Sequence, residues 1–353
     1  MKKRFITIIS CVAVLLLLVP NVSFAYSNDW LDGDTELSAH RGAHVVAPEN
    51  SVEAIKWAGL LDYGFVEIDI QETKDGYYVL MHDADIDRTT NGSGKIENLT
   101  LEEIKSYNMV TEDGTVTDIK VPTLEEALEA AAKYDVGVNF DGSKGDWEDK
   151  DFVDYVMELA EETGVLDKSF FVLSNKEIRD QFNEWYPEAT VTFLGNASEN
   201  VEEDIEELQK YKSSLYTTSI HNIDEKSAQK IHDAGMGIHL YQVNTAELYN
   251  EAIKYQPRLI ETDVIIPGGA INLATSVEQL SKLNVIESSG NSLVLGTNLM
   301  LVSLYEKLDQ GHKVIKHLEN FKEIVNYMHE YDHLPDYVKD ILIINADKII
   351  SQW

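Results

Sequence analysis

The stretch FVEIDIQ at residues 65–71 alternates apolar and polar side chains, which is the pattern of a β-strand with one polar face. Side chains two positions apart on a strand share a face and lie roughly 6.6 Å apart along it. Glu67 and Asp69 are therefore expected to project together, so that both carboxylates can converge on one hard cation. A solvated strand edge with two acids would show the same alternation, so the surrounding residues must decide between these interpretations.

Two histidines end the short apolar runs before and after this strand. His40 follows residues 37–39 and His82 follows residues 77–81, so each is expected at the carboxyl end of a strand. A single histidine there is more often a structural hydrogen-bonding residue. Two histidines around a carboxylate pair, with Arg41 adjacent, fit phosphodiester cleavage, which needs a base, an acid and cationic donors for the phosphate oxygens. Histidine titrates near neutrality and arginine presents a fork of donors, as these roles require.

Beyond this region the chain repeats short strand patterns and helical patterns in turn. Asn50 with Glu53, and Thr123 with Glu126, predict capping boxes at the start of two helices. About eight strand–helix units predict an α/β fold, a (β/α)8 TIM barrel with its site at the carboxyl ends of the strands. A doubly wound sheet is the alternative, because a repeat of elements does not show that the sheet closes. The barrel strands are expected at residues 37–40, 65–71, 136–141, 169–173, 189–194, 215–218, 237–243 and 259–262.

Several short motifs surround the strand at residues 65–71. They are HRG at 40–42, PEN at 48–50, KDG at 74–76, HD at 82–83 and RTT at 88–90. Together with the Glu-x-Asp strand, and in this order, they resemble the signature of the glycerophosphodiester phosphodiesterase family. Fainter similarity continues to about residue 268. The resemblance implies a barrel over residues 37–270 with a small insertion at about 84–122, and release of glycerol 3-phosphate and an alcohol from glycerophosphodiesters.

The resemblance also implies further site residues. The family carries a third acidic ligand at the end of the third barrel strand, where this chain has the shorter Asp141. The family's lysine position falls on Ser143, and Lys144 comes one place late. Either Gly142 lets the backbone bulge so that Lys144 faces the phosphate, or the lysine role is vacant. Tyr241 stands where the family has a tryptophan that lines the alcohol pocket.

Other residues near these motifs are expected to support the site. Glu49 and Asp83 are placed to orient Arg41 and His82. Asp263, which follows the last strand as it does in the family, is expected in a structural or supporting role. The remaining histidines have no partner pattern, so surface or structural roles are expected for them.

Glu67, Asp69 and Asp141 would offer only oxygen ligands, which favour Ca²⁺ or Mg²⁺ over Zn²⁺, with Ca²⁺ preferred outside the cell. We therefore expect a metal-dependent phosphodiesterase in which His40 and His82 share the acid and base roles, in either assignment. Attack by water and attack by the substrate's own hydroxyl, through a cyclic phosphate, both fit these residues. The alternatives are a lyase of the phospholipase D toxin type, an enzyme of wall teichoic acid, and a non-catalytic phosphodiester-binding barrel.

The first 25 residues read as a signal peptide. Basic residues 2–4, an apolar run over 5–19 and small residues at 23 and 25 predict cleavage before Tyr26. A membrane anchor is the alternative, but the apolar run is short for a spanning helix. The only cysteine, Cys11, lies in this segment, which excludes disulfides and thiolate metal sites from the mature chain. A secreted, extracellular or wall-associated protein is expected.

The chain carries 62 acidic and 29 basic residues, for a net charge of −33. A surface of this charge repels nucleic acids, so none is expected as a partner. An anionic phosphodiester must then be held by local cations.

Residues 267–269 (PGG) end the predicted barrel, and from Ser276 the strand pattern disappears. Amphipathic helices are expected at residues 299–308, 317–331 and 337–350. This tail, residues 276–353, resembles a small helical module appended to secreted hydrolases of Gram-positive bacteria. We expect an accessory wall-binding or packing domain without catalytic residues.

Overall fold

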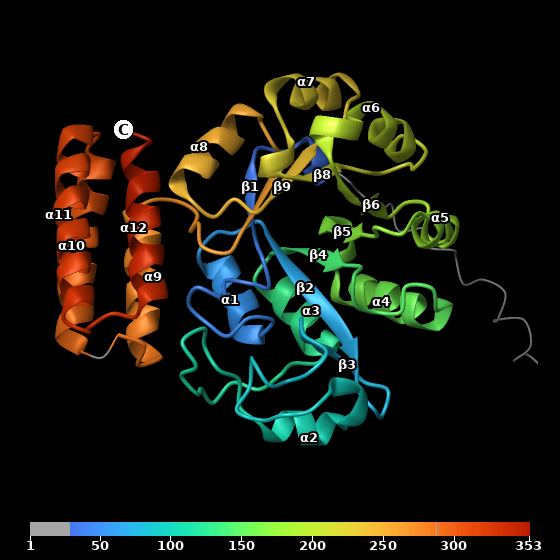
Figure 1. Ribbon diagram of the computed structural model, residues 1–353, viewed down its shortest axis with the longest axis horizontal. Helices are drawn as coiled ribbons and strands as arrows, with labels where there is room; N and C mark the ends of the chain where they lie inside the picture. The colour runs from blue at the N-terminus through green and yellow to red at the C-terminus, as the bar shows by residue number, and fades with distance from the viewer. Residues whose placement is uncertain (1–28, 287) are drawn as a thin grey trace, which may run out of the picture.

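The computed structural model describes residues 29–286 and 288–353. The signal peptide predicted for residues 1–25 lies outside the described residues. The described chain forms a barrel of strands surrounded by helices, and four long helices stand side by side at one flank of the barrel (Figure 1).

The barrel strands are all parallel and follow one another around a ring. Their order is β6-β5-β4-β2-β1-β10-β9-β8-β7. The first and last of these, β6 and β7, are separated in the chain only by Phe193, so they are two parts of one barrel strand and the ring closes there. The predicted (β/α)8 barrel is thus confirmed over the doubly wound sheet. The strands are β1 (Glu36–Ala39), β2 (Phe65–Glu72), β4 (Gly137–Asp141), β5 (Ser169–Val172), β6 (Thr190–Thr192), β7 (Leu194–Gly195), β8 (Tyr216–Ser219), β9 (Ile238–Tyr241) and β10 (Leu259–Thr262).

Helices cover the outside of the barrel. Thr123 and Glu126 form the expected capping box of α3. The other predicted box is wrong, because Ser51 caps α1 while Asn50 bonds to Asp69 inside the barrel. The helices are α1 (Val52–Leu60), α3 (Leu124–Lys133), α4 (Lys150–Thr163), α5 (Lys176–Trp185), α6 (Ala197–Leu208), α7 (Glu225–Asp233) and α8 (Ala246–Lys254), with short 3-10 turns η3 (Leu166–Lys168) and η4 (Ile220–Asn222).

The amino end of the barrel is closed by aromatic packing. Trp30, in the 3-10 turn η1 (Asp29–Asp32), lies against Phe65 and Phe170 with ring centroids 4.9 and 5.8 Å away. The polar site residues therefore lie at the opposite, carboxyl end of the strands.

The insertion between β2 and β4 has a small core of its own. Strand β3 (Tyr78–Leu80) pairs antiparallel with β2, outside the ring, and η2 (Ile96–Asn98) and α2 (Leu101–Ser106) follow. The buried apolar residues of this core are Val79, Met81, Ile86, Ile96, Ile104, Met109 and Val121. The insertion lies beside the carboxyl end of β2 (Figure 1).

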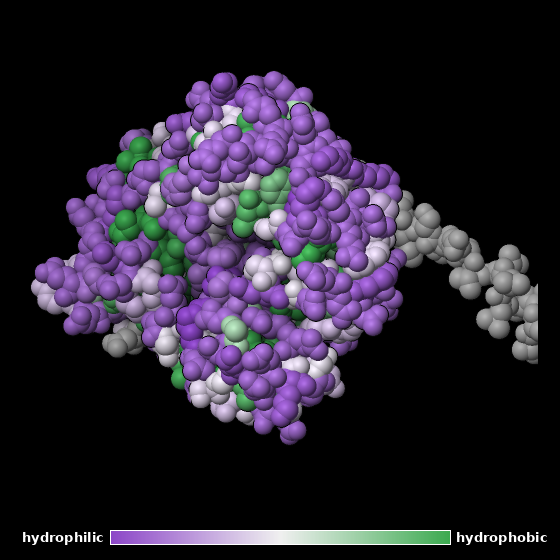
Figure 2. Space-filling view, turned by 45° about the vertical axis from the view of Figure 1, so that its right-hand side comes forward, coloured by the Kyte–Doolittle hydropathy of each residue, from purple (hydrophilic) through white to green (hydrophobic). Residues whose placement is uncertain are grey.

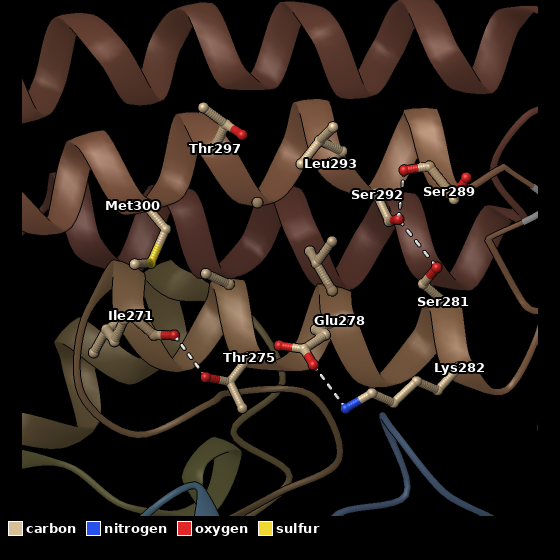
Figure 3. Close-up of a pocket in the computed structure, with 13 residues that line it drawn as sticks. Ile271, Thr275, Glu278, Ser281, Lys282, Ser289, Ser292, Leu293, Thr297 and Met300 are labelled. Carbon is tan, nitrogen blue, oxygen red and sulfur yellow. Dashed lines mark hydrogen bonds and ion pairs between the residues drawn. The ribbon is translucent and has the colours of Figure 1, made fainter.

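Four helices form the carboxyl-terminal module: α9 (Ala270–Lys282), α10 (Ser289–Lys307), α11 (Gly311–Glu330) and α12 (Asp336–Ile350). The sequence prediction missed α9 and the first half of α10. Residues 289–305 contain no charged residue, so the sequence of α10 shows no charged stripe over this range. A groove of about 700 Å³ lies between α9 and α10, where Ser281 donates to Ser292 (Figure 3). No helix in the described ranges is long and apolar enough to cross a membrane.

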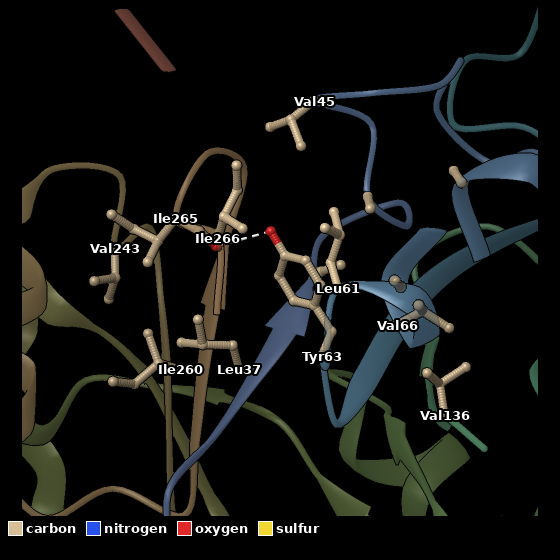
Figure 4. Close-up of a cluster of buried hydrophobic side chains, with 14 of the residues drawn as sticks. Leu37, Val45, Leu61, Tyr63, Val66, Val136, Val243, Ile260, Ile265 and Ile266 are labelled. Atoms are coloured by element: carbon tan, nitrogen blue, oxygen red, sulfur yellow. Dashed lines mark hydrogen bonds between the residues drawn. The ribbon is translucent and has the colours of Figure 1, made fainter. Parts of the chain in front are cut away.

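One hydrophobic cluster runs from the barrel into the module. It includes Ile265 and Ile266, which follow β10, together with Leu342 and Ile349 of α12. Figure 4 shows Ile265 and Ile266 beside Tyr63, which comes from the loop before β2. The module is therefore packed on the barrel. The face of the molecule shown in Figure 2 is mostly hydrophilic, in keeping with the charge of the chain.

Candidate active site

Three carboxylates converge at the carboxyl end of the barrel. Glu67 and Asp69 lie on β2, and Asp141 ends β4, whose register places it opposite Asp69. Each carboxylate offers an oxygen atom, and these oxygens all lie within 4.8 Å of one another. Strand alternation brings the first two together and the parallel pairing of β2 with β4 adds the third.

This carboxylate triad carries more negative charge than its surroundings neutralise. Burial and the charge of Asp69 raise the pKa of Glu67 well above its usual range. Burial and the charge of Asp141 raise the pKa of Asp69, against the hydrogen bond from Asn50. Asp69 Oδ1 is buried and has no hydrogen-bond partner among the described residues. Three close carboxylates with an oxygen left over fit a divalent cation with oxygen ligands.

The HRG motif places Arg41 against the triad. Arg41 has a positive φ of 56°, and its backbone N–H donates to Glu67 Oε2 at 2.9 Å. Its guanidinium Nε lies 3.7 Å from Asp69 Oδ2, and Nη1 donates to Glu49 at 3.3 Å. Gly42 follows with a φ of 78°, and a Cβ there would lie 2.7 Å from the Ala54 Cβ of α1. The glycine thus allows helix α1 to pack under the arginine.

His40 follows β1 and is held from the opposite end of the chain. Its Nδ1 lies 2.6 Å from Asp263 Oδ1, and its Nε2 lies 3.9 Å from Glu67 Oε2. Asp263 follows β10, and β1 pairs with β10 so that Ala39 faces Thr262. The closing of the barrel therefore creates this contact. Burial would lower the pKa of His40, but the hydrogen bond to Asp263 and the charge of Glu67 raise it to about 10.

Asp263 accepts hydrogen bonds on both of its carboxylate oxygens. Besides His40, His44 Nε2 lies 3.2 Å from Oδ1, and Asn244 Nδ2 donates to Oδ2 at 2.5 Å. The backbone N–H of Asp263 donates in turn to Asn244 Oδ1 at 2.9 Å. Although burial alone would raise the pKa of Asp263, the bonds from His40 and His44 hold it far below its usual range. Asp263 is thus a charged acceptor, and His40 Nδ1 carries the proton.

His82 is held by its neighbour in the chain. Its Nδ1 lies 2.8 Å from Asp83 Oδ1, and Arg88 Nε donates to Asp83 Oδ2 at 2.7 Å. Arg88 also donates twice to Glu49, at 2.7 and 2.8 Å. The hydrogen bond from Arg88 is the main reason that the pKa of Asp83 is lowered. Asp83, Arg88 and Glu49 therefore form a row of alternating charges beside His82, and Glu49 at its end also accepts the hydrogen bond from Arg41.

Two cavities adjoin these groups. The first, of about 160 Å³, lies over the barrel mouth and is lined by His40, Glu67, Asn139, Asp141, Val172, Leu194, Thr217, His239, Tyr241 and Glu261. The second, of about 460 Å³, lies between the barrel and the insertion and includes Arg41, His44, Arg88, Glu112 and Asp263 in its walls. Tyr241 is half-buried in the first cavity. The first cavity thus has His40 in its wall, and the second has Asp263, to which His40 bonds.

Comparison with known families assigns both parts of the chain. Residues 40–266 match the model of the glycerophosphoryl diester phosphodiesterase family. The chain belongs to the glycerophosphoryl diester phosphodiesterase family. Residues 270–351, which contain α9–α12, match the model of the FIMAH domain.

Individual relatives match part of this family region. A glycerophosphodiester phosphodiesterase of Caldanaerobacter subterraneus subsp. tengcongensis is 40% identical over 112 residues, which cover 31% of this chain and 46% of the relative. One from Bacillus subtilis is 35% identical over 144 residues, covering 38% of this chain and 49% of the relative. The matched region thus spans less than half the length of these curated relatives.

Solved structures share the barrel. A putative glycerophosphoryl diester phosphodiesterase of Agrobacterium tumefaciens superimposes with a TM-score of 0.58 at 20% identity, over 70% of this chain and 100% of that one. A phosphodiesterase of Oleispira antarctica, solved with the product sn-glycerol-3-phosphate, gives a TM-score of 0.57 at 23% identity, over 65% of this chain and 92% of that one. At these identities the likeness shows the fold.

Within this glycerophosphoryl diester phosphodiesterase fold, the segment after Asp141 departs from the expected bulge. The ladder between β4 and β5 keeps its register to Asp141, and the Gly142 N–H donates to Val172 O at 3.0 Å. A Cβ at Gly142 would lie 2.3 Å from that oxygen, so the glycine serves close strand approach. Of the two alternatives for this segment, a bulge at Gly142 or a vacant lysine role, the bulge is not formed. Ser143 bonds to both Asp141 oxygens, whereas Lys144 makes no hydrogen bond or ion pair in the described chain and lines neither cavity.

The sequence reasoning missed the partner of His40 in this family member. Asp263 was expected in a structural or supporting role without a named partner, and His44 was expected in a surface or structural role. The available signal was an acid directly after the last strand, because strands one and eight of a closed barrel are neighbours. Arg88 belongs to the RTT motif, but the sequence predicted no role for it. In the structure it bridges Asp83 and Glu49.

Proposed function

We propose that this chain is a metal-dependent phosphodiesterase that hydrolyses glycerophosphodiesters to glycerol 3-phosphate and an alcohol. The observation that carries the proposal is the pair of carboxylate-held histidines, His40 and His82, beside one carboxylate triad at the barrel mouth. Family membership supports the reaction class. The Oleispira antarctica neighbour, which was solved with sn-glycerol-3-phosphate, supports the identity of the product.

Glu67, Asp69 and Asp141 would hold one divalent cation. Their oxygen ligands favour Ca²⁺ or Mg²⁺ over Zn²⁺, and Ca²⁺ is preferred to Mg²⁺ for a protein that acts outside the cell. When bound, such a cation draws negative charge from the phosphate oxygens and so makes phosphorus easier to attack. Arg41, whose Nε is buried and has no hydrogen-bond partner in the described chain, supplies the fixed positive charge beside the triad. Tyr241 forms part of the cavity wall that faces the substrate.

The two histidines share the proton transfers. Asp263 and Asp83 accept hydrogen bonds from the Nδ1 atoms of His40 and His82, which leaves each Nε2 for chemistry. One histidine accepts a proton from water as the water oxygen bonds to phosphorus. The other donates a proton to the departing alcohol oxygen as its bond to phosphorus breaks. Both histidines adjoin the triad: His40 Nε2 lies 3.9 Å from Glu67 Oε2, and His82 follows Met81, whose N–H donates to the carbonyl oxygen of Asp69.

We also propose that the protein is secreted and acts on diesters at the cell wall, including teichoic acid. The basic and apolar amino-terminal segment supports export. The net charge of −33 disfavours nucleic acid as a substrate. A pull-down of the purified chain with isolated walls, compared with walls stripped of teichoic acid, tests this location.

The activity is tested by measuring glycerol 3-phosphate released from glycerophosphocholine. Protein dialysed against EDTA should be inactive, and Ca²⁺ should restore activity at lower concentration than Mg²⁺. Asp141→Asn should raise the Ca²⁺ concentration needed, while the exposed Asp146→Asn in the same loop should not. Full turnover after EDTA would refute metal dependence, and no release with either ion would refute the activity. A cyclic phosphate seen by ³¹P NMR would favour the lyase.

A further inference from the structure

Two buried polar side chains of α12 face the segment that follows β10. Asn345 and Lys348 are 1% and 2% exposed, one turn apart on the helix. Residues 264–268 run between the barrel and this helix. A helix that only packs against a barrel needs apolar side chains here, because burying an amide and an amine costs free energy unless both are hydrogen-bonded.

Both side chains bind the backbone of that segment, and Asn345 Nδ2 also donates to Ile341 O of its own helix at 2.9 Å. Asn345 Oδ1 accepts from the Ile266 N–H at 2.7 Å, and Nδ2 donates to Val264 O at 2.8 Å. Lys348 Nζ donates to Ile266 O at 2.6 Å and to Gly268 O at 2.8 Å. Four backbone groups within five residues are therefore bonded to one helix of the module.

The barrel holds the same segment from the other side. Tyr63 donates its hydroxyl to Ile265 O at 2.8 Å (Figure 4), and Thr262 Oγ1 accepts from the Val264 and Ile265 N–H groups. The side chains of Ile265 and Ile266 are buried in the shared core. The segment is thus clamped between the barrel and α12, with few backbone groups free to move.

Asp263 is the residue directly before this clamped segment. We propose that Asn345 and Lys348 are positioning residues that set Asp263 against His40 by fixing the backbone of residues 264–268. The module is then a part of the support of the active site. Its catalytic consequence rests on the proposed function, whereas the positioning itself does not.

A spectroscopic measurement tests the positioning without any assay. The proton in the 2.6 Å bond between His40 Nδ1 and Asp263 should resonate far downfield in ¹H NMR, and His40→Gln identifies it by its loss. Asn345→Leu and Lys348→Met should shift or broaden this resonance. Lys339→Met removes a lysine from the same helix at a partly exposed site beside Asp340, and should leave the resonance unchanged.

Activity provides the second readout. Asn345→Leu and Lys348→Met should each lower kcat roughly tenfold with KM within about twofold, because supporting contacts act on the orientation of the reacting group. In an Asp263→Asn background the same changes should cost almost nothing more, since the contact through which they act is gone. A general loss of stability would lower activity by the same factor in both backgrounds.

The outcomes separate the two proposals. If the wild type releases no glycerol 3-phosphate, the proposed function fails, and the His40 resonance still decides the positioning. An unchanged resonance in both variants, or additive losses of kcat with Asp263→Asn, overturns the positioning. If the larger changes prevent folding, Asn345→Asp keeps the side-chain size but replaces the donor to Val264 O, and the same resonance should move.

Discussion

The two histidines of the site are held in opposite ways. His40 bonds to Asp263, which lies 223 residues further along the chain, whereas His82 bonds to the adjacent Asp83. The first pair exists only because β1 and β10 are neighbours in the closed barrel. The second needs only a local turn of the backbone. The same chemical unit, an imidazole on a carboxylate, is therefore built once by topology and once by sequence adjacency.

The supports of the two pairs differ as well. Asp263 accepts from His44 and Asn244 in addition to His40 and leads into a buried segment clamped by α12. Asp83 depends on Arg88, which is 48% exposed and therefore partly screened by water. We therefore expect a substitution of Asp263 to disturb contacts on several parts of the fold, and a substitution of Asp83 to disturb only the contacts beside it.

The largest expected effect comes from removing the imidazole of either histidine–aspartate pair. His40→Ala and His82→Ala should each lower kcat by roughly 10²–10⁴-fold, the usual contribution of general acid–base catalysis. His221→Ala, an exposed histidine far from both pairs in the sequence, should have no effect. Steady-state release of glycerol 3-phosphate measures this, and near wild-type turnover of either variant would remove that histidine from the mechanism.

The next effect compares the two carboxylates directly. Asp263→Asn should lower kcat/KM by roughly 100-fold and Asp83→Asn by roughly tenfold, within the range for residues that orient a functional imidazole. The larger loss at Asp263 follows from its three side-chain partners, His40, His44 and Asn244, and from the clamped segment that follows it. Equal losses, or a larger loss at Asp83, would contradict the comparison.

A smaller effect concerns the buried amine of Lys348, which binds the segment that follows Asp263, the partner of His40. Burial lowers the pKa of Lys348 to about 8, against the charge of Glu306, while an unfolded lysine titrates near 10.5. The unfolded state therefore binds more protons between these values, and stability should rise with pH across that window. Relative to Lys348→Met, the wild type should gain about 2 kcal/mol of unfolding free energy from pH 8 to 9.5. Urea titrations measure this gain, and a constant difference would contradict it.

The smallest expected effect concerns a residue that belongs to neither pair. Lys144→Ala should leave kcat/KM within about twofold, because Lys144 lines neither cavity and makes no ion pair among the described residues. Ser143→Lys tests the vacant role, since it restores the lysine of the family pattern. A tenfold loss in Lys144→Ala would place a phosphate contact there, on the scale of one electrostatic donor.

Much of the site follows from the sequence because it depends on local geometry. Alternation on one strand places Glu67 and Asp69 on one face, and the end of the next barrel strand supplies Asp141. His82 and Asp83 are adjacent, so their pairing follows from the motif itself. The order of strands and helices likewise follows from periodicities of two and 3.6 residues.

The tertiary structure alone decided which distant groups meet. Periodicity carries no information on ring closure, so the contact between His40 and Asp263 could not be read before β1 was placed beside β10. The capping role of Asn50 was mispredicted because a capping box is a local pattern, whereas its bond to the buried Asp69 is a tertiary contact. Asn345 and Lys348 look like ordinary polar residues of a helix, and only docking on the barrel buries them against backbone groups that need partners.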